Sequence, residues 1–146
     1  AIALLGLLIW LWRRWRRRVA RGLSPRQIAE RDFARIDSQR LIESGESERY
    51  AVEMVQVLRR YLAATVPAAA QSATTHELAD SLQRSAVVPT QSLIDVLDAT
   101  DLIKFARERS TAERAREIGV AARRIVVDTD TAVEAANAAA EKAKAA

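Results

Sequence analysis

The sequence predicts an all-α protein, in which one partial transmembrane helix is followed by a cytoplasmic bundle of about five helices. The chain of 146 residues contains only 4 Gly and 3 Pro, which are too few for an all-β fold with a turn about every 8–12 residues. Apolar residues make up 49% and charged residues 29% of the chain, and many are the helix formers Ala, Arg, Glu and Lys. Capping patterns and apolar stripes then mark the individual helices.

The amino-terminal segment, residues 1–21, is predicted to be the end of a membrane helix with a basic collar. Residues 1–12 are uncharged and are followed at once by RRWRRR. A secretory signal carries its positive charge before the apolar run, whereas this order is typical of a membrane helix whose carboxyl end faces the cytoplasm. The run reaches about 18 Å against a core of roughly 30 Å, so we expect the sequence to begin inside the span. An amphipathic helix lying on the membrane is the alternative, although no polar face interrupts residues 1–12.

Aromatic and basic side chains meet where this apolar run ends. An indole ring can bury its body and keep its N–H in water, and arginines near the surface can bind anionic lipid headgroups with about 1 kcal/mol each. The predicted membrane-interface residues are Trp10, Trp12, Trp15, Arg13, Arg14, Arg16, Arg17 and Arg18.

The next segment, residues 22–130, is predicted to form the cytoplasmic helical bundle. Its first helix has Ser24 as N-cap, Pro25 at the first helical position and Gln27 completing a capping box. We expect this helix to run to about Ser44 and to end at Gly45. Ser47 is the predicted cap of the second helix, which Pro67 ends. Its apolar stripe follows i, i+3, i+4, i+7 spacing and comprises Ala51, Met54, Val55, Leu58, Tyr61, Leu62 and Thr65.

Three further helices complete the predicted bundle. A capping box from Thr74 to Glu77 opens a short helix, and Thr90 can cap the next one, whose apolar residues are Leu93, Ile94, Leu97, Leu102 and Phe105. A box from Ser110 to Glu113 opens the last helix, with an apolar stripe of Ile118, Ala122, Ile125 and Val126. The expected aromatic anchors of the core are Phe33, Tyr50, Tyr61 and Phe105.

Residues 131–146 form an Ala-rich tail. From Ala132 onward nine of fifteen residues are Ala. Such a tail can be helical but has little to bury, so it is expected to fray unless a partner holds it.

The composition leaves little material for catalysis, and we expect neither a cofactor nor an enzyme. Cys is absent, which excludes a disulfide framework, a thiolate metal site and a cysteine nucleophile. The single His is too little for a His-based relay, and the four isolated Gly provide no phosphate-binding loop. Residues 76–80 (HELAD) resemble an interrupted zinc-peptidase helix, but Asp80 replaces the second imidazole that holds the metal.

The charge pattern argues against a nucleic-acid partner. The net charge is +4, yet residues 1–21 hold six Arg and no acid. The remaining 17 basic and 19 acidic residues give residues 22–146 a net charge of −2. Nucleic-acid binding needs a basic face on the folded surface.

Charged residues on two helices suggest protein docking. Asp95, Asp98 and Asp101 are spaced by three, which could form a carboxylate pair, although an exposed helix face has the same spacing. Asp101 and Lys104 can pair on a helix surface, and two Arg flank the buried stripe around Tyr61. Solvated faces explain these charges equally well. The alternative is a docking surface for an acidic partner, and its candidate residues are Arg59, Arg60, Asp101 and Lys104.

Three strings resemble a known family when they are taken together: 58–62 (LRRYL), 74–78 (TTHEL) and 101–106 (DLIKFA). Their order and spacing are similar to the cytoplasmic region of uncharacterised bacterial membrane proteins encoded beside MoxR-type AAA ATPases and von Willebrand-A (Bat, aerotolerance-type) proteins. The resemblance covers residues 32–129. It implies a bacterial inner-membrane anchor and a helical cytoplasmic domain without an established catalytic role. Members of that family usually have more chain before the membrane segment than this sequence shows, and the Ala-rich tail lies outside the pattern.

Two functions follow as hypotheses. The first is a non-catalytic, membrane-anchored accessory subunit, whose bundle docks on a larger respiratory, photosynthetic or transport complex. The second is an adaptor that couples a MoxR-type AAA ATPase to a von Willebrand-A envelope system. An enzyme would need a pocket containing His76 or the carboxylates at 95–101, and none is expected.

Overall fold

The computed structural model describes residues 22–69, 74–83 and 85–146. This part of the chain is all-helical and contains no strand, which confirms the predicted class and the five-helix bundle. The elements are α2 (Pro25–Ser38), α3 (Ser47–Thr65), the 3-10 helix η1 (Pro67–Ala69), α4 (Thr75–Leu82), α5 (Thr90–Phe105) and α6 (Ala112–Ala145).

The predicted membrane helix and its Trp and Arg collar fall in residues 1–21, outside the described residues. Among the helices that are described, none combines the length and apolar character needed to cross a membrane.

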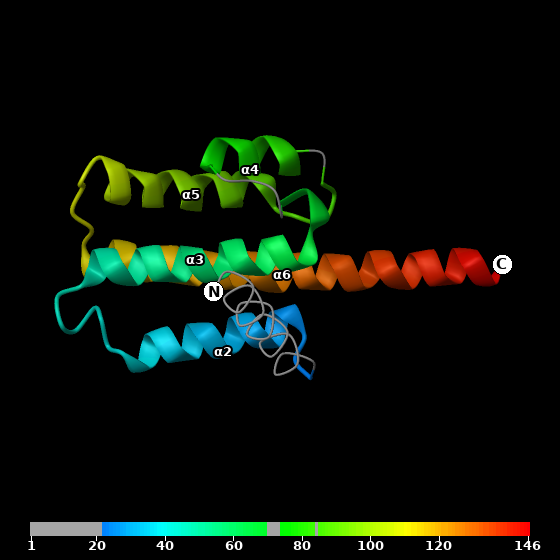
Figure 1. Cartoon of the computed structure of the whole chain (residues 1–146), viewed down its shortest axis with the longest axis horizontal. Coiled ribbons are helices and arrows are strands. Elements are labelled where there is room, and N and C mark those ends of the chain that lie inside the picture. The colour runs from blue at the N-terminus through cyan, green and yellow to red at the C-terminus, as the bar shows by residue number, and fades with distance from the viewer. Residues whose placement is uncertain (1–21, 70–73, 84) are drawn as a thin grey trace, which may run out of the picture.

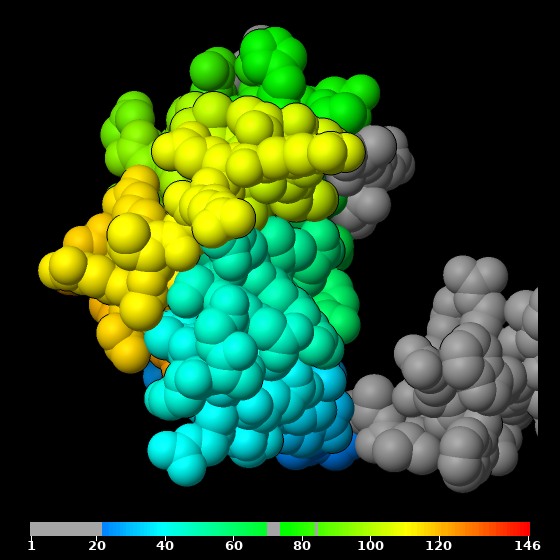
Figure 2. Space-filling view, turned by 90° about the vertical axis from the view of Figure 1, so that its left-hand side faces the viewer, coloured from blue at the N-terminus to red at the C-terminus, as the bar shows by residue number. Residues whose placement is uncertain are grey.

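The helices are arranged in layers. Helices α3 and α6 lie side by side in the middle, α2 covers them on one side, and α5 with α4 covers them on the other (Figure 1). The same order is visible from one end of the bundle (Figure 2). The last part of α6 projects beyond the other helices (Figure 1), and residues 134–146 are exposed.

Helix α2 begins as the sequence predicts but ends six residues early. The Ser24 hydroxyl accepts a hydrogen bond from the Gln27 N–H, and the Gln27 side chain accepts one from the Ser24 N–H. The predicted end near Ser44 is wrong, because the helix stops at Ser38. Arg40 takes a left-handed conformation with φ of 50°, and the chain turns so that Leu41 enters the core, where it is 4% exposed.

Helix α3 is the most extensively buried element. The predicted stripe is buried from Ala51 to Leu62, and only Thr65 is partly exposed. Met54, Leu58 and Leu62 have no exposed surface. Full burial of an aliphatic side chain contributes about 1.5–3 kcal/mol, so this stripe is a main source of stability.

The predicted caps are correct at one of the other four helices. Thr74 and Glu77 form their capping box at the start of α4. The predicted caps of α3 and α5 are wrong, because Ser47 and Thr90 are themselves the first helical residues. For α6 the cap is Thr111, whose hydroxyl accepts the Arg114 N–H at 3.1 Å.

The predicted stripe of α6 is buried, but two apolar residues of α5 are not. Ile118, Ala122, Ile125 and Val126 all belong to the core. Phe105, predicted as a core anchor, is 77% exposed, and Leu102 is 51% exposed. The physical reason is their position on the helix: they lie on the opposite side of α5 from the residues that face the core.

One close contact joins α3 to α6 near the start of α6. Gly119 lies against the Tyr50 ring so closely that an added Cβ would stand 2.7 Å from Tyr50 Oη and 2.9 Å from Cε1. The Tyr50 hydroxyl donates to Asp37 Oδ1 of α2 at 3.5 Å, and Asp37 also pairs with Arg123 of α6. The Arg123 guanidinium lies 5.0 Å from the Phe33 ring centre. Three helices therefore meet at Tyr50.

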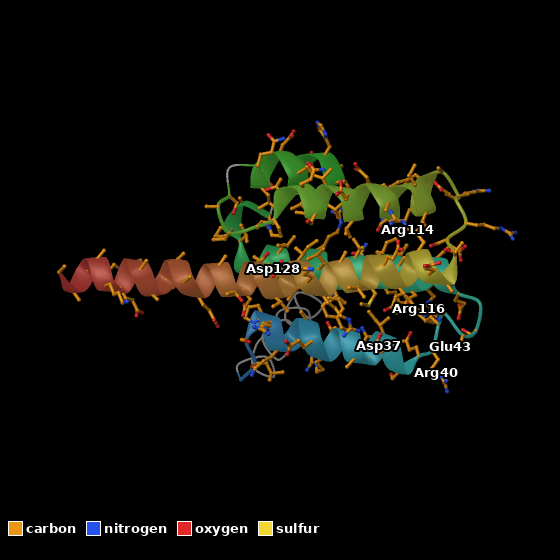
Figure 3. The ribbon with its side chains drawn as sticks, turned by 180° about the vertical axis from the view of Figure 1, so that it is seen from behind. Asp37, Arg40, Glu43, Arg114, Arg116 and Asp128 are labelled. Carbon is orange, nitrogen blue, oxygen red and sulfur yellow. The ribbon has the colours of Figure 1, made fainter. Side chains whose placement is uncertain are left out.

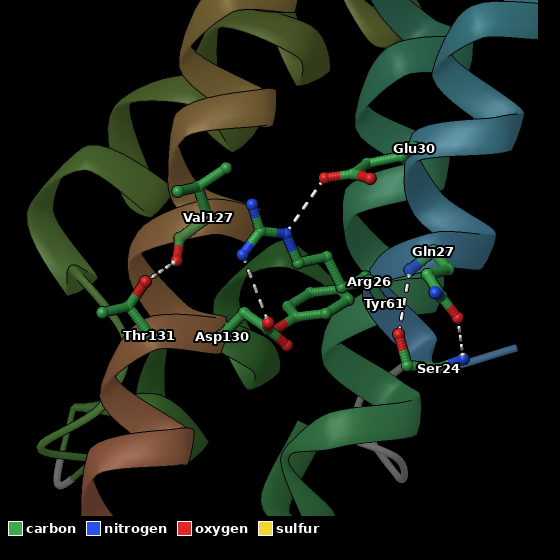
Figure 4. A network of polar contacts seen from close by, with 8 residues as sticks. All are labelled: Ser24, Arg26, Gln27, Glu30, Tyr61, Val127, Asp130 and Thr131. Carbon is green, nitrogen blue, oxygen red and sulfur yellow. Dashed lines mark hydrogen bonds and ion pairs between the residues drawn. The ribbon is translucent and has the colours of Figure 1, made fainter.

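A second polar contact joins the same helices three turns further along (Figure 4). The Tyr61 hydroxyl donates to Asp130 Oδ1 at 3.1 Å, and Arg26 Nη1 lies 3.6 Å from the other oxygen of that carboxylate. Arg26 also donates from Nε to Glu30 at 3.0 Å. Burial, and then the hydrogen bond to Asp130, raise the pKa of Tyr61 well above its ordinary value.

We expect Gly119→Ala to lower the free energy of unfolding by about 1–3 kcal/mol, because the Tyr50 ring must move or the helices must separate. Chemical denaturation of the full chain in detergent measures the change. Val120→Ala is the matched control, since Val120 is 67% exposed on the same helix. Equal stability of the Gly119 variant and the wild type would contradict the close contact.

We expect stability to fall as the pH rises above about 10, because the unfolded chain releases its tyrosine protons there and the folded chain does not. The loss reaches at most about 1.4 kcal/mol per pH unit for each tyrosine. Tyr61→Phe should cost about 1 kcal/mol at pH 8 for the lost hydrogen bond, yet show a flatter dependence between pH 9 and 11. Denaturation curves at each pH make the comparison. The two chains differ only at residue 61, so an identical slope would contradict the role of Tyr61.

Candidate functional site

The four residues predicted to form a docking surface do not come together. Arg59 donates to the Thr75 hydroxyl of α4 at 2.6 Å, and Arg60 lies 3.4 Å from Asp32 of α2. Both belong to the carboxyl half of α3. Asp101 and Lys104 are near the end of α5, at the opposite end of the bundle (Figure 1). The two arginines are therefore engaged within the chain.

Asp101 and Lys104 do not form an ion pair with each other, although their spacing allows one. Lys104 instead places Nζ 5.3 Å from the centre of the Phe105 ring. A cation over an exposed aromatic face contributes about 0.5–1 kcal/mol.

The HELAD string forms an ordinary helix start. Glu77 completes the cap of Thr74, and His76 Nε2 lies 3.4 Å from Asp80 with both side chains mostly exposed. In the described part of the chain, no three His, Cys, Asp or Glu side chains are close enough together to hold a metal ion.

The outer side of α5 carries a stripe of four residues at i, i+3, i+7 and i+10 spacing, which we name the α5 outer stripe: Asp95, Asp98, Leu102 and Phe105. All four are exposed. The core-facing residues, Leu93, Val96, Leu97 and Thr100, occupy the other side of the helix. Spacing of this kind places the four on one face, and helix α4 leaves the last turns of α5 uncovered (Figure 1).

Neither Asp95 nor Asp98 of this stripe has an ion-pair partner within the described residues. Asp95 accepts a hydrogen bond from the Gln91 amide at 2.9 Å. Carboxylates of the neighbouring layers do form ion pairs: Asp32 pairs with Arg60, and Asp128 pairs with Arg124. Like charges one helical turn apart destabilise a helix by about 0.2–0.5 kcal/mol. The stripe therefore combines unpaired negative charge with exposed apolar surface.

A groove between α5 and α6 runs beside the stripe. It consists of two adjoining hollows of about 270 and about 100 Å³, which share Ala99, Arg114 and Ile118 as lining residues. Figure 3 shows Arg114 in the space between α6 and α5, where it pairs with Glu117 at 3.0 Å. The small side chains of Ala99 and Ala121 keep the groove open.

The loop between α5 and α6 closes one end of this groove. The Glu48 carboxylate of α3 accepts the backbone N–H of Ser110 at 3.0 Å. Hydrogen bonds from its own backbone N–H and from that of Ser110, with a smaller contribution from the charge of Arg109, lower the pKa of Glu48. Arg107 adopts a φ of 51°, which turns the chain after α5. The loop thus holds the ends of the two helices in register.

The four residues of this stripe were predicted separately from the sequence. Asp95 and Asp98 were candidates for a carboxylate pair, and Leu102 and Phe105 were expected on the apolar side of the helix. The signal that unites the four is their common i, i+3, i+7, i+10 spacing. That spacing puts them on a face different from that of Leu93 and Leu97.

No protein-family model matches this chain, and neither a curated protein nor a solved structure matches it.

Proposed function

We propose that the protein is a non-catalytic accessory subunit, anchored in the bacterial inner membrane by one helix, whose helical domain docks on a larger membrane-protein complex of respiratory, photosynthetic or transport type. The observation that carries this proposal is the exposed apolar end of α5. Phe105 and Leu102 are 77% and 51% exposed, because they lie on the side of α5 that faces away from the core. Exposed apolar surface with a polar rim is typical of interaction sites.

The membrane anchor rests on the order of residues 1–18. An uncharged run followed by Trp and Arg residues favours a single pass with the carboxyl-terminal domain in the cytoplasm. Anionic lipid headgroups are the proposed partners of the Arg collar. The bundle then stands close to the membrane, where a complex of membrane proteins can reach α5.

The alternative function, an adaptor for a MoxR-type AAA ATPase and a von Willebrand-A system, rests on the resemblance of the three strings. Two of these strings are in contact in the fold, because Arg59 of 58–62 donates to Thr75 of 74–78. Recovery of an AAA ATPase in a pull-down with the full chain would favour the adaptor. Recovery of integral membrane subunits would favour the accessory subunit.

We expect Ala143→Cys to remain unlabelled by a membrane-impermeant maleimide in intact cells and to react after lysis. The chain has no other Cys, so the introduced thiol is the only target. A periplasmic protein with one Cys is the positive control. The protein should also stay with membranes after an alkaline wash. Labelling in intact cells would contradict the orientation, and release by the wash would contradict the span.

We expect the full chain, extracted from its native membrane in mild detergent, to migrate on a native gel together with larger membrane-protein subunits. The physical reason is that the apolar end of α5 is buried only in a complex. Mass spectrometry of the band identifies the partners. A monodisperse single chain with no co-migrating protein would contradict the proposed function.

A further inference from the structure

The α5 outer stripe has two halves of different chemistry. Asp95 and Asp98 supply negative charge on the first half, and Leu102 and Phe105 supply apolar surface on the second. The four positions span ten residues, which is about 15 Å along the helix. A ligand that satisfies both halves must therefore be extended along α5 for about three turns.

Helix α5 carries a net negative charge. It contains three Asp and a single base, Lys104, and it has no Arg. The short helix α4 is also acidic, whereas α6 carries Arg114, Arg116, Arg123 and Arg124. A cation placed beside Asp95 and Asp98 would be attracted to both carboxylates and would reduce the repulsion between them.

We propose that the α5 outer stripe binds an amphipathic α-helix of a partner protein, with Arg or Lys of that helix against Asp95 and Asp98 and apolar side chains against Leu102 and Phe105. This inference rests on the proposed function and names its docking surface and the chemistry of its partner. A helix fits because one face can present basic and apolar residues at matching spacing. The groove beside the stripe, with Ala99 and Ala121 in its lining, accepts the flank of such a helix.

The test measures binding of two synthetic helical peptides to the full chain in detergent by fluorescence anisotropy. The peptides share one apolar stripe and differ only in two positions one turn apart, which are Arg in the first and Glu in the second. We expect the Arg peptide to bind, and its Kd to rise when NaCl increases from about 50 to about 300 mM. The Glu peptide should bind at least about tenfold more weakly.

Substitutions on the stripe measure the contributions of its acidic half and its apolar half to binding separately. Asp95→Asn with Asp98→Asn should raise the Kd of the Arg peptide by about threefold to tenfold and flatten its salt dependence. Leu102→Ser with Phe105→Ser should raise the Kd by more than about tenfold. Circular dichroism checks that both variants fold, which is expected because all four side chains are exposed.

Two control variants lie on other surfaces. Glu43→Gln removes an exposed charge from the loop after α2 (Figure 3), and Val120→Ser removes an exposed apolar side chain from α6. Both should leave the Kd unchanged. Equal binding of the two peptides, or an unaltered Kd in both stripe variants, would overturn the proposal.

Other occupants give distinct results that would also overturn it. A second copy of the chain would show as a concentration-dependent mass in sedimentation, lost in the Leu102→Ser, Phe105→Ser variant. Occupation by the chain's own Trp and Arg segment would show as tighter peptide binding after Trp10, Trp12 and Trp15 are changed to Ala.

The native-gel experiment separates this proposal from the proposed function. If the wild-type complex forms and the stripe variants lose it, both stand. If the variants keep the complex, the docking surface is wrong and the proposed function stands. If the wild type forms no complex but binds the Arg peptide in the expected pattern, the proposed function is wrong and the stripe is a binding site.

Discussion

Helix α3 can be buried along most of its length only if helices pack on several sides of it, and the rest of the bundle follows from that requirement. Its core residues include Tyr50, Met54, Leu58 and Leu62. They require α2 on one side, α6 alongside and α5 on the other side. Each of these outer helices then needs only one apolar face for the core. Any further apolar residue on an outer helix has no place inside the bundle.

The contact between α3 and α6 is fixed at two points. Tyr50 meets Gly119 near the start of α6, and Tyr61 donates to Asp130 three turns later. Each point includes a carboxylate that also pairs with an arginine, so that charge and packing act together. Beyond Asp130 the tail of α6 leaves the bundle at the end where α2 begins (Figure 1).

The elements that the sequence predicts well are those whose signals are local. The capping boxes at Ser24 and Thr74 depend on residues three apart, and both form as expected. The end of α2 was not predictable in this way. Leu41 and Ile42 continue an apolar pattern beyond Ser38, and only the need to bring Leu41 into the core selects a turn at Arg40. That need arises from contacts between helices, which periodicity does not report.

The candidate site was predictable only in its local sequence pattern. The spacing of Asp95, Asp98 and Asp101 was visible, and so were Leu102 and Phe105 as apolar residues. Their exposure was not, because a stripe on the outside of a helix has the same period as a stripe on the inside. Only the packing of α5 on α3, with Leu93 and Leu97 inward, decides which face meets water.

In natural proteins the local sequence pattern usually agrees with the packing of the fold. Positions where the two disagree are expected to be functional sites. Here the two kinds of disagreement coincide on α5, although Val120 and Val127 of α6 are also exposed apolar residues. Elsewhere on the bundle, carboxylates such as Asp37 and Asp130 lie beside arginines, and large apolar residues such as Phe33 lie in the core. Along three turns of α5, by contrast, two carboxylates lie without an arginine partner and two large apolar side chains lie outside the core. Repulsion between Asp95 and Asp98 and the hydration of Phe105 each lower stability a little, and neither helps the fold. A partner that supplies positive charge and apolar surface along the same three turns removes both costs at once, which is why this disagreement is better explained by binding than by loose packing.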